Sequence, residues 1–120
     1  MVIGAGAVGL LCAVAARLEG CTRIVITDIV RGRVDFAVQN NFADAGFVTP
    51  VERASSPQAQ LGTAKQIASS IGELSYPDGL PVGRTDYTFE CTGVESCVQS
   101  SIYVWLPPGS QHAHSKANTQ

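Results

Sequence analysis

Three glycines near the start of the chain, Gly4, Gly6 and Gly9, have the spacing of a loop that binds phosphate groups. They form GAGAVG, which satisfies the pattern G-x-G-x-x-G. The pattern alone is weak evidence, because glycine-rich hexamers also arise by chance. Here a predicted strand precedes it, a predicted helix follows it, and an acid, Asp28, closes the next predicted strand. This combination predicts a dinucleotide-binding site.

Each part of the motif has a physical role in such a site. Gly4 permits the tight turn from strand to helix, and Gly6 has no side chain, so a pyrophosphate can approach the backbone. Gly9 lets the helix pack close to the strand. The unpaired N–H groups around Ala7 and Val8 would face the phosphates at the positive end of the helix dipole. The alternative is that the glycines serve helix packing only.

The acid and its neighbours bear on which dinucleotide is bound. Asp28 is predicted to accept hydrogen bonds from both hydroxyls of the adenosine ribose, and its charge would repel a 2′-phosphate. This favours NAD over NADP. Arg31 and Arg33 complicate the choice, because arginine at this corner can accommodate a 2′-phosphate. We interpret both as flanking the site, with Arg31 at a solvated helix end. A flavoprotein, which shares the fingerprint, remains an alternative.

The elements that must position these residues alternate along the chain. We expect strands at residues 1–3, 23–28, 46–49 and 86–91, and helices at 7–18, 32–41, 57–72 and 94–106. Alternating strands and helices predict an α/β fold with parallel strands and right-handed crossovers, a truncated Rossmann-type doubly wound sheet in three αβα layers. The expected strand order is 3-2-1-4, with the dinucleotide crevice between the first and fourth strands. The first helix is apolar on nearly every side and is expected to be buried.

Composition limits the other classes of function. The chain has 120 residues, of which 45% are hydrophobic, and its net charge is −2. The hydrophobic share is typical of one soluble domain. The slightly negative net charge is unlike that of a nucleic-acid-binding protein, which is usually strongly basic. The apolar stretch 8–18 is too short to cross a bilayer. We therefore expect a cytoplasmic protein with no membrane or nucleic-acid partner. Residues 1–109 are expected to form the dinucleotide-binding domain, and residues 110–120, which have no apolar period, a disordered tail.

The metal-ligating residue types do not form a recognisable site. The four cysteines include no C-x-x-C pair, and we interpret them as buried, reduced thiols, with a disulfide or a structural metal as the alternatives. They are Cys12, Cys21, Cys91 and Cys97. His112 and His114 have no third ligand nearby, so no metal site is predicted there.

Three segments together resemble a known family. VIGAGAVGLLCAVAA, IVITDIVRGRVDFAV and DYTFECTGVESCVQSSIY resemble the cofactor domain of zinc-dependent medium-chain dehydrogenases, in particular polyol dehydrogenases of the sorbitol/xylitol type. The resemblance implies an oxidoreductase that transfers hydride between a polyol and NAD. It also implies that Arg33 lies beside the adenosine and that Cys91, Thr92 and Gly93 run along the cofactor. Simple packing at the strand end is the alternative for Cys91.

The chain also departs from the family pattern. The family's zinc ligands, a Cys, a His and a Glu, belong to a catalytic domain that precedes the first strand, and no such domain is recognisable here. Family members also continue into a fifth and a sixth strand after a proline-glycine turn, which residues 107–109 only approximate. We therefore expect the chain to hold a dinucleotide but not to oxidise a polyol alone. A non-catalytic or degenerate dinucleotide-binding module is the alternative.

The missing strands have a structural consequence. A fourth strand without a neighbour leaves an open sheet edge, which favours a homo-oligomer or aggregation.

Overall fold

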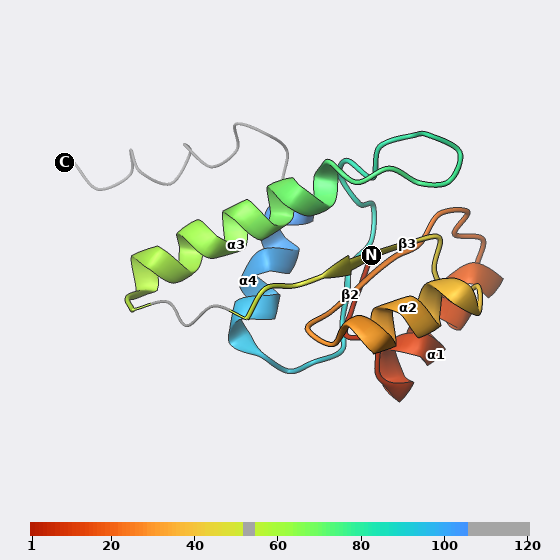
Figure 1. Cartoon of the computed structure of the whole chain (residues 1–120), viewed down its shortest axis with the longest axis horizontal. Coiled ribbons are helices and arrows are strands. Elements are labelled where there is room, and N and C mark those ends of the chain that lie inside the picture. The colour runs from red at the N-terminus through yellow and green to blue at the C-terminus, as the bar shows by residue number, and fades with distance from the viewer. Residues whose placement is uncertain (52–54, 106–120) are drawn as a thin grey trace.

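The computed structural model describes residues 1–51 and 55–105, and four strands and four helices alternate along them (Figure 1). The strands are β1 (Val2–Ile3), β2 (Val25–Asp28), β3 (Ala45–Val48) and β4 (Phe89–Glu90). The helices are α1 (Ala7–Leu18), α2 (Arg31–Gln39), α3 (Pro57–Gly72) and α4 (Glu95–Trp105). The expected helix at 94–106 and the expected tail at 110–120 extend into residues outside the described ranges, as does the turn at 107–109.

The four strands form one parallel sheet in the order β3-β2-β1-β4, which confirms the predicted order and the α/β class. In the register of the sheet, Ile3 lies opposite Thr27 of β2 and Glu90 of β4. The residues that follow these three positions, Gly4, Asp28 and Cys91, therefore share the carboxyl edge of the sheet. In open α/β sheets, ligands bind at this edge, where the strand order reverses.

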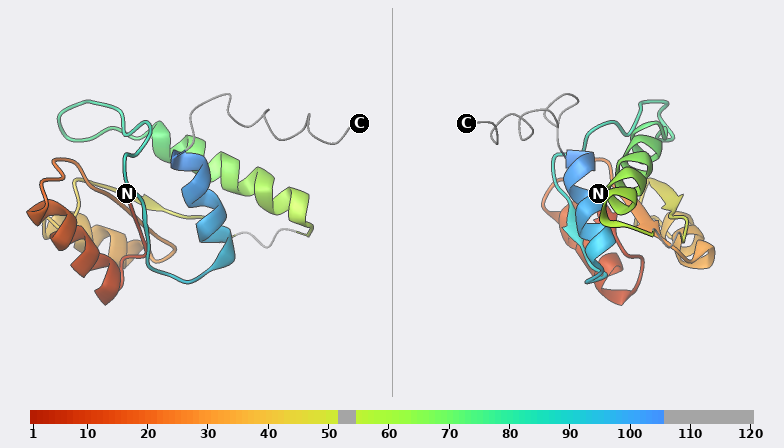
Figure 2. Two further views of the ribbon diagram at one scale, coloured as in Figure 1. Left: turned by 180° about the vertical axis from the view of Figure 1, so that it is seen from behind. Right: turned by 90° about the vertical axis from the view of Figure 1, so that its left-hand side faces the viewer.

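The sheet is the middle of three layers (Figure 2). Alternate residues of a strand point to opposite faces, so Ile3 and Val25 belong to one apolar cluster and Val2 and Ile26 to the other. Helices α3 and α4 cover the first face through Ile71 and Val104 and their neighbours. Helices α1 and α2 cover the second face with alanines. The three-layer arrangement follows from this division of the core.

Helix α1 has the predicted bounds and packs against the sheet as expected, but only one side of it is buried. Its buried positions are Gly9, Ala13 and Ala16. The large apolar side chains lie on the opposite side, where Val8, Leu11 and Leu18 are 62%, 69% and 81% exposed. The small residues form the contact because they let the helix axis approach the sheet closely. The bulky residues are left as an apolar stripe toward solvent.

Strand β4 is shorter than the predicted 86–91. Among the described residues it pairs with β1 alone, which has two residues, and the ladder comprises Phe89 and Glu90. Before it, the hydroxyls of Thr85 and Thr88 hydrogen-bond each other at 3.0 Å, and the carbonyl of Tyr87 accepts a hydrogen bond from the Met1 amine. These contacts hold the segment next to β1 without extending the sheet.

The other predicted boundaries shift by a few residues. Strand β2 starts at Val25 rather than at residue 23, β3 starts at Ala45, and α2 begins at Arg31. Helix α3 begins as predicted, with the Ser56 hydroxyl accepting a hydrogen bond from the N–H of Ala59 and Pro57 in the first helical position.

Candidate dinucleotide site

The first glycine of the loop is required by the backbone. Gly4 has φ +101°, a left-handed conformation that side chains rarely adopt. Its N–H donates to the carbonyl of Thr27 at 2.7 Å, which fixes the loop to the end of β2. A Cβ at Gly4 would lie 3.0 Å from Cγ2 of Thr92 and 3.4 Å from the Cys91 carbonyl. The loop after β1 is therefore packed against the segment after β4.

The third glycine is required by packing. A Cβ at Gly9 would lie 1.7 Å from the carbonyl oxygen of Gly4, a separation that no rearrangement of a side chain could relieve. Helix α1 and the turn before it touch backbone to backbone at this position. The role predicted for Gly9, close approach of helix and strand, matches this geometry.

The middle glycine differs from the other two. Gly6 has φ −79° and ψ −172°, which any residue can adopt, and a Cβ there would meet nothing within 4 Å. Neither backbone strain nor packing within the described chain requires glycine at this position. Gly6 is the N-cap of α1 and makes no side-chain cap, and Ala7 and Val8 beside it are exposed. Open space therefore adjoins the start of the helix.

The acid that ends β2 lies beside this loop. Oδ2 of Asp28 accepts the N–H of Ala5 at 2.8 Å, and Oδ1 accepts the N–H of Val30 at 2.9 Å. The Asp28 side chain is only 8% exposed, and the guanidinium of Arg33 approaches its Oδ2 to 3.9 Å. Each carboxylate oxygen has two lone pairs, so each still has capacity for a further donor. The acid is thus held in one orientation at the carboxyl edge.

The segment after β4 forms the other wall of the edge. Cys91 continues the contact with β1, because its N–H donates to the Ile3 carbonyl at 2.8 Å. Thr92 and Gly93 are exposed, and Gly93 has φ +70°. The structure thus brings every residue predicted for the site to the carboxyl edge, on the loops after β1, β2 and β4 and the first turns of α1 and α2.

Glu90 was not singled out from the sequence. Its carboxylate accepts the N–H groups of Thr92 at 2.7 Å and Gly93 at 2.9 Å, and also the hydroxyl of Thr92. Partial burial acts to raise the pKa of Glu90, but these hydrogen bonds outweigh it, and the pKa lies below the ordinary value of 4.5. Glu90 therefore shapes the turn that carries Thr92 and Gly93. Its sequence signal is an acid two residues before Thr-Gly, separated from it by Cys91, in a stretch with turn-forming residues.

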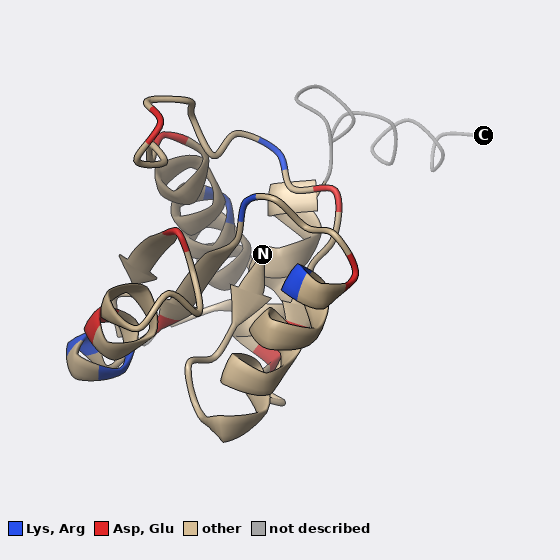
Figure 3. Cartoon of the chain, turned by 90° about the vertical axis from the view of Figure 1, so that its right-hand side faces the viewer, with Lys and Arg blue, Asp and Glu red and all other residues tan. Residues whose placement is uncertain are grey.

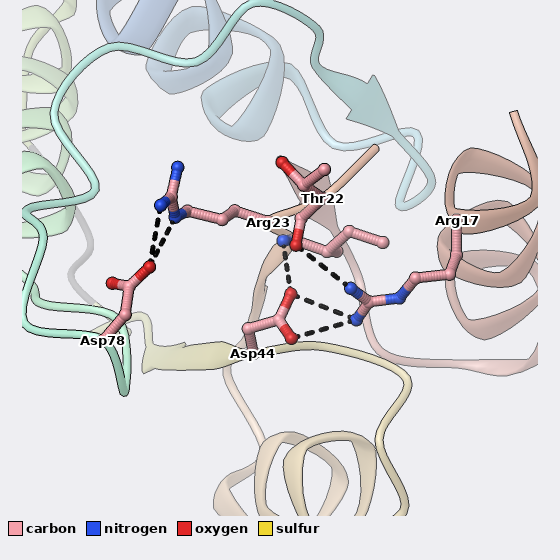
Figure 4. A network of polar contacts seen from close by, with 6 residues as sticks. Arg17, Thr22, Arg23, Asp44 and Asp78 are labelled. Atoms are coloured by element: carbon pink, nitrogen blue, oxygen red, sulfur yellow. Dashed lines mark hydrogen bonds and ion pairs between the residues drawn. The ribbon is translucent and has the colours of Figure 1, made fainter. Parts of the chain in front are cut away.

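The opposite edge of the sheet holds a polar network that the sequence did not reveal (Figure 4). Asp44, just before β3, accepts two hydrogen bonds from one guanidinium nitrogen, Nη2 of Arg17 in α1, and also the N–H of Ile24 at 2.7 Å. Arg23 pairs with Asp78 at 2.8 Å. A cavity of about 390 Å³ also opens at this edge, lined in part by Met1 and Tyr76. We assign it no ligand, because the phosphate-binding turn lies at the other end of the strands.

Lysine and arginine are scattered among the acids rather than gathered on one face (Figure 3). Within residues 1–51 and 55–105, no group of three or more His, Cys, Asp or Glu side chains could hold a metal ion. His112 and His114 lie outside these ranges. In the same residues, no helix is both long and apolar enough to cross a membrane.

The chain is similar in sequence to several known dehydrogenases and reductases. The chain is 37% identical over 108 residues to an L-arabinitol 4-dehydrogenase of Aspergillus oryzae, covering 86% of this chain and 25% of that protein. It is 32% identical to a sorbitol dehydrogenase of Bos taurus over 86% of this chain and 24% of the relative. It is 35% identical to a probable D-xylulose reductase A of Arthroderma otae over 92% of this chain and 27% of the relative.

No family model matches the chain, and no solved structure matches it. The chain spans about a quarter of the length of the curated relatives it matches. The loop GAGAVG, the acid Asp28 and the parallel sheet are nevertheless present in the order that a dinucleotide-binding half-fold requires. The chain is a homologue of polyol dehydrogenases over a segment that amounts to about a quarter of their length.

Proposed function

We propose that this chain binds NAD at the carboxyl edge of its sheet and is the NAD-binding part of an oxidoreductase that acts on a polyol. The observation that carries the proposal is the open space at Gly6. If the glycines served packing alone, all three would be expected to face a steric or conformational constraint. Gly4 and Gly9 do, but Gly6 does not. Gly6 is the N-cap of α1 inside the G-x-G-x-x-G loop, and the open space there lets a ligand come close to the first N–H groups of the helix.

The residues around Gly6 fit a dinucleotide in kind and in position. The exposed first turn of α1, at Ala7 and Val8, would donate N–H groups to the pyrophosphate. Asp28 would receive the hydroxyls of the adenosine ribose on its remaining lone pairs. Arg33 would flank the adenosine, and residues 91–93 would run along the cofactor. The bound cofactor would supply the acceptor for hydride, and this chain's residues would orient it.

The charge at Asp28 supports NAD rather than NADP. Its carboxylate is held close to the loop by Ala5 and Val30, so it cannot easily turn away from an incoming 2′-phosphate. Arg33 is 59% exposed at its side chain and lies near the same acid, where it partly offsets this charge. A phosphate beside Asp28 would still be close to a fixed anion. We therefore propose a preference for NAD that is moderated by Arg33.

The described residues do not fit the zinc that the family resemblance implies, since they contain no cluster able to hold a metal ion. We propose accordingly that the part of the enzyme represented here binds the cofactor and does not itself activate the alcohol. The second candidate is a dinucleotide-binding module without catalysis.

We also propose that the chain associates with copies of itself. The exposed stripe of α1, at Val8, Leu11 and Leu18, is apolar over nearly three turns of helix. Within the described residues, β4 has a strand partner on the β1 side only. Exposed apolar surface and an unpaired strand edge both favour association.

The test is calorimetric titration of the purified chain and two glycine variants with NAD and NADP. Gly6→Ala is expected to leave the melting temperature nearly unchanged, because the added Cβ has room, but to weaken NAD binding at least tenfold. The matched control is Gly62→Ala in α3, where a Cβ also meets nothing within 4 Å; it should leave NAD binding unchanged. Equal NAD affinity for the wild type and Gly6→Ala, or no NAD binding by a folded wild type, would refute the assignment.

A further inference from the structure

Two of the four cysteines face each other across the junction of α1 and the sheet. Sγ of Cys91, just after β4, lies 3.7 Å from Sγ of Cys12 in α1, and the thiol of Cys91 donates a hydrogen bond to the Cys12 sulfur. Both residues are partly buried, and all four cysteines are free thiols. Cys12, Cys21 and Cys91 pack on one apolar cluster and Cys97 on the cluster of the other sheet face, but only the Cys12 and Cys91 sulfurs are in contact among the described residues. The Cys12–Cys91 pair is thus set apart by geometry.

We propose that Cys12 and Cys91 form a redox-modification site, which a small disulfide such as glutathione disulfide converts into an intrachain disulfide. In the first step, the Cys12 thiolate attacks one sulfur of glutathione disulfide, and one glutathione thiolate leaves. In the second step, Cys91 gives up its proton and attacks the Cys12 sulfur, and the second glutathione leaves. The two protein thiols lose two protons and two electrons, and glutathione disulfide is reduced to two glutathione molecules.

The order of the two steps follows from the environment of each sulfur. Burial, the hydrogen bond to Cys12 and the nearby charges of Cys12 and Glu90 raise the pKa of the Cys91 thiol to about 11. Cys91 is therefore a neutral thiol near pH 7, and thiolate is the attacking form in disulfide exchange. Cys12 receives the hydrogen bond and is the sulfur that attacks first. Cys91 is then already in contact with the mixed disulfide that it must resolve.

The fold permits the bond without unfolding. The two sulfurs have to approach from 3.7 Å to about 2.0 Å, which is within the reach of side-chain rotation and a slight shift of α1. The two residues are 79 positions apart in the chain, so the bond would close a long loop and constrain the unfolded state strongly. It would also fasten the segment after β4, which lies against Gly4, to α1.

The experiment uses the full reduced chain, incubated with glutathione disulfide, then alkylated and analysed by intact mass and non-reducing peptide mapping. The expected product has lost two hydrogen atoms and contains a peptide pair joined through Cys12 and Cys91. Its melting temperature should rise by roughly 10 °C and return after reduction, given the length of the closed loop. The disulfide is detected without any cofactor. A chain that does not form it can therefore be told apart from a chain that does not bind NAD.

Four single variants locate the bond. Cys12→Ser and Cys91→Ser should abolish the intrachain product, and Cys91→Ser should stop at the mixed glutathione disulfide on Cys12. The matched controls, Cys21→Ser and Cys97→Ser, should form the bond as the wild type does. A linkage in the wild type that involves Cys21 or Cys97, or glutathione adducts alone, would overturn the proposal. The peptide map of the oxidised wild-type chain shows which cysteines are joined, so the proposal is tested even if a serine variant does not fold.

Discussion

Oδ2 of Asp28 accepts the backbone N–H of Ala5 at 2.8 Å, so the acid that ends β2 is fastened to the glycine loop that follows β1. The contact joins residues 23 positions apart in the chain. It places the carboxylate at the carboxyl edge of the sheet, where the same side chain stabilises the glycine loop. Changes at Asp28 are therefore expected to affect folding and cofactor choice together.

Asp28→Asn separates these two roles. The amide oxygen keeps one acceptor for Ala5 or Val30, so the loss of stability should be about 1 kcal/mol. Loss of the charge should weaken NAD binding by about 1–3 kcal/mol while NADP binding weakens less or improves. Calorimetry with both cofactors and thermal unfolding measure the two effects. An unchanged ratio of NAD to NADP affinity would contradict the role of Asp28 in cofactor choice.

Gly9→Ala should disrupt the fold rather than the ligand site alone. The added Cβ would sit 1.7 Å from the Gly4 carbonyl oxygen, so α1 would have to move away from the sheet. We expect a loss of at least about 3 kcal/mol in unfolding free energy, near the upper end for overpacking. Urea unfolding measures it, with Gly62→Ala as the control in open space. A midpoint close to that of the wild type would show that the backbone contact is not required.

Glu90→Gln should make stability less dependent on pH. The pKa of Glu90 in the folded chain is below its ordinary value of 4.5, so the folded state favours the ionised carboxylate. This contribution is fully present above about pH 4.5 and is lost as the pH falls through the lower folded value. At pH 7 the variant should lose about 0.5–1 kcal/mol, a modest figure because solvent reaches the carboxylate.

Urea unfolding of the Glu90→Gln variant and the wild type between pH 3 and 7 is the relevant measurement. The two stability curves should converge toward the acid end, where Glu90 is protonated in both states. A difference that stays constant over this range would show that the hydrogen bonds from Thr92 and Gly93 do not depend on the charge.

Leu11→Lys should reduce self-association. Leu11 is 69% exposed on the apolar stripe of α1, so lysine there costs no core packing and adds charge to the surface. Light scattering during size-exclusion chromatography should show a shift toward the monomer.

Tyr87→Lys, at a residue 68% exposed beside β4, tests the sheet edge instead. Leu80→Lys, 49% exposed in a loop, is the control. Unchanged association in both test variants would exclude the two surfaces.

Most of the fold was predictable because its signals are local. The bounds of α1 follow from an apolar run between a glycine turn and Gly20, and the start of α3 follows from a serine cap and a proline. Alternation of strands and helices, together with the handedness of crossovers, leaves few strand orders for a chain of this length. The glycine spacing and the acid Asp28 likewise predict a dinucleotide site, and the structure places these residues together at the carboxyl edge of the sheet.

Tertiary structure decided which side chains meet across the sheet. The sequence of α1 is apolar all round, and only packing against the strands selects the small face for burial and leaves Leu11 and Leu18 outside. Tertiary structure also brings together Asp44 and Arg17, which are 27 positions apart in the chain, and Cys12 and Cys91, which are 79 positions apart. Local propensity extends over only a few residues, whereas these contacts depend on the register of the parallel strands and on how closely each helix approaches them.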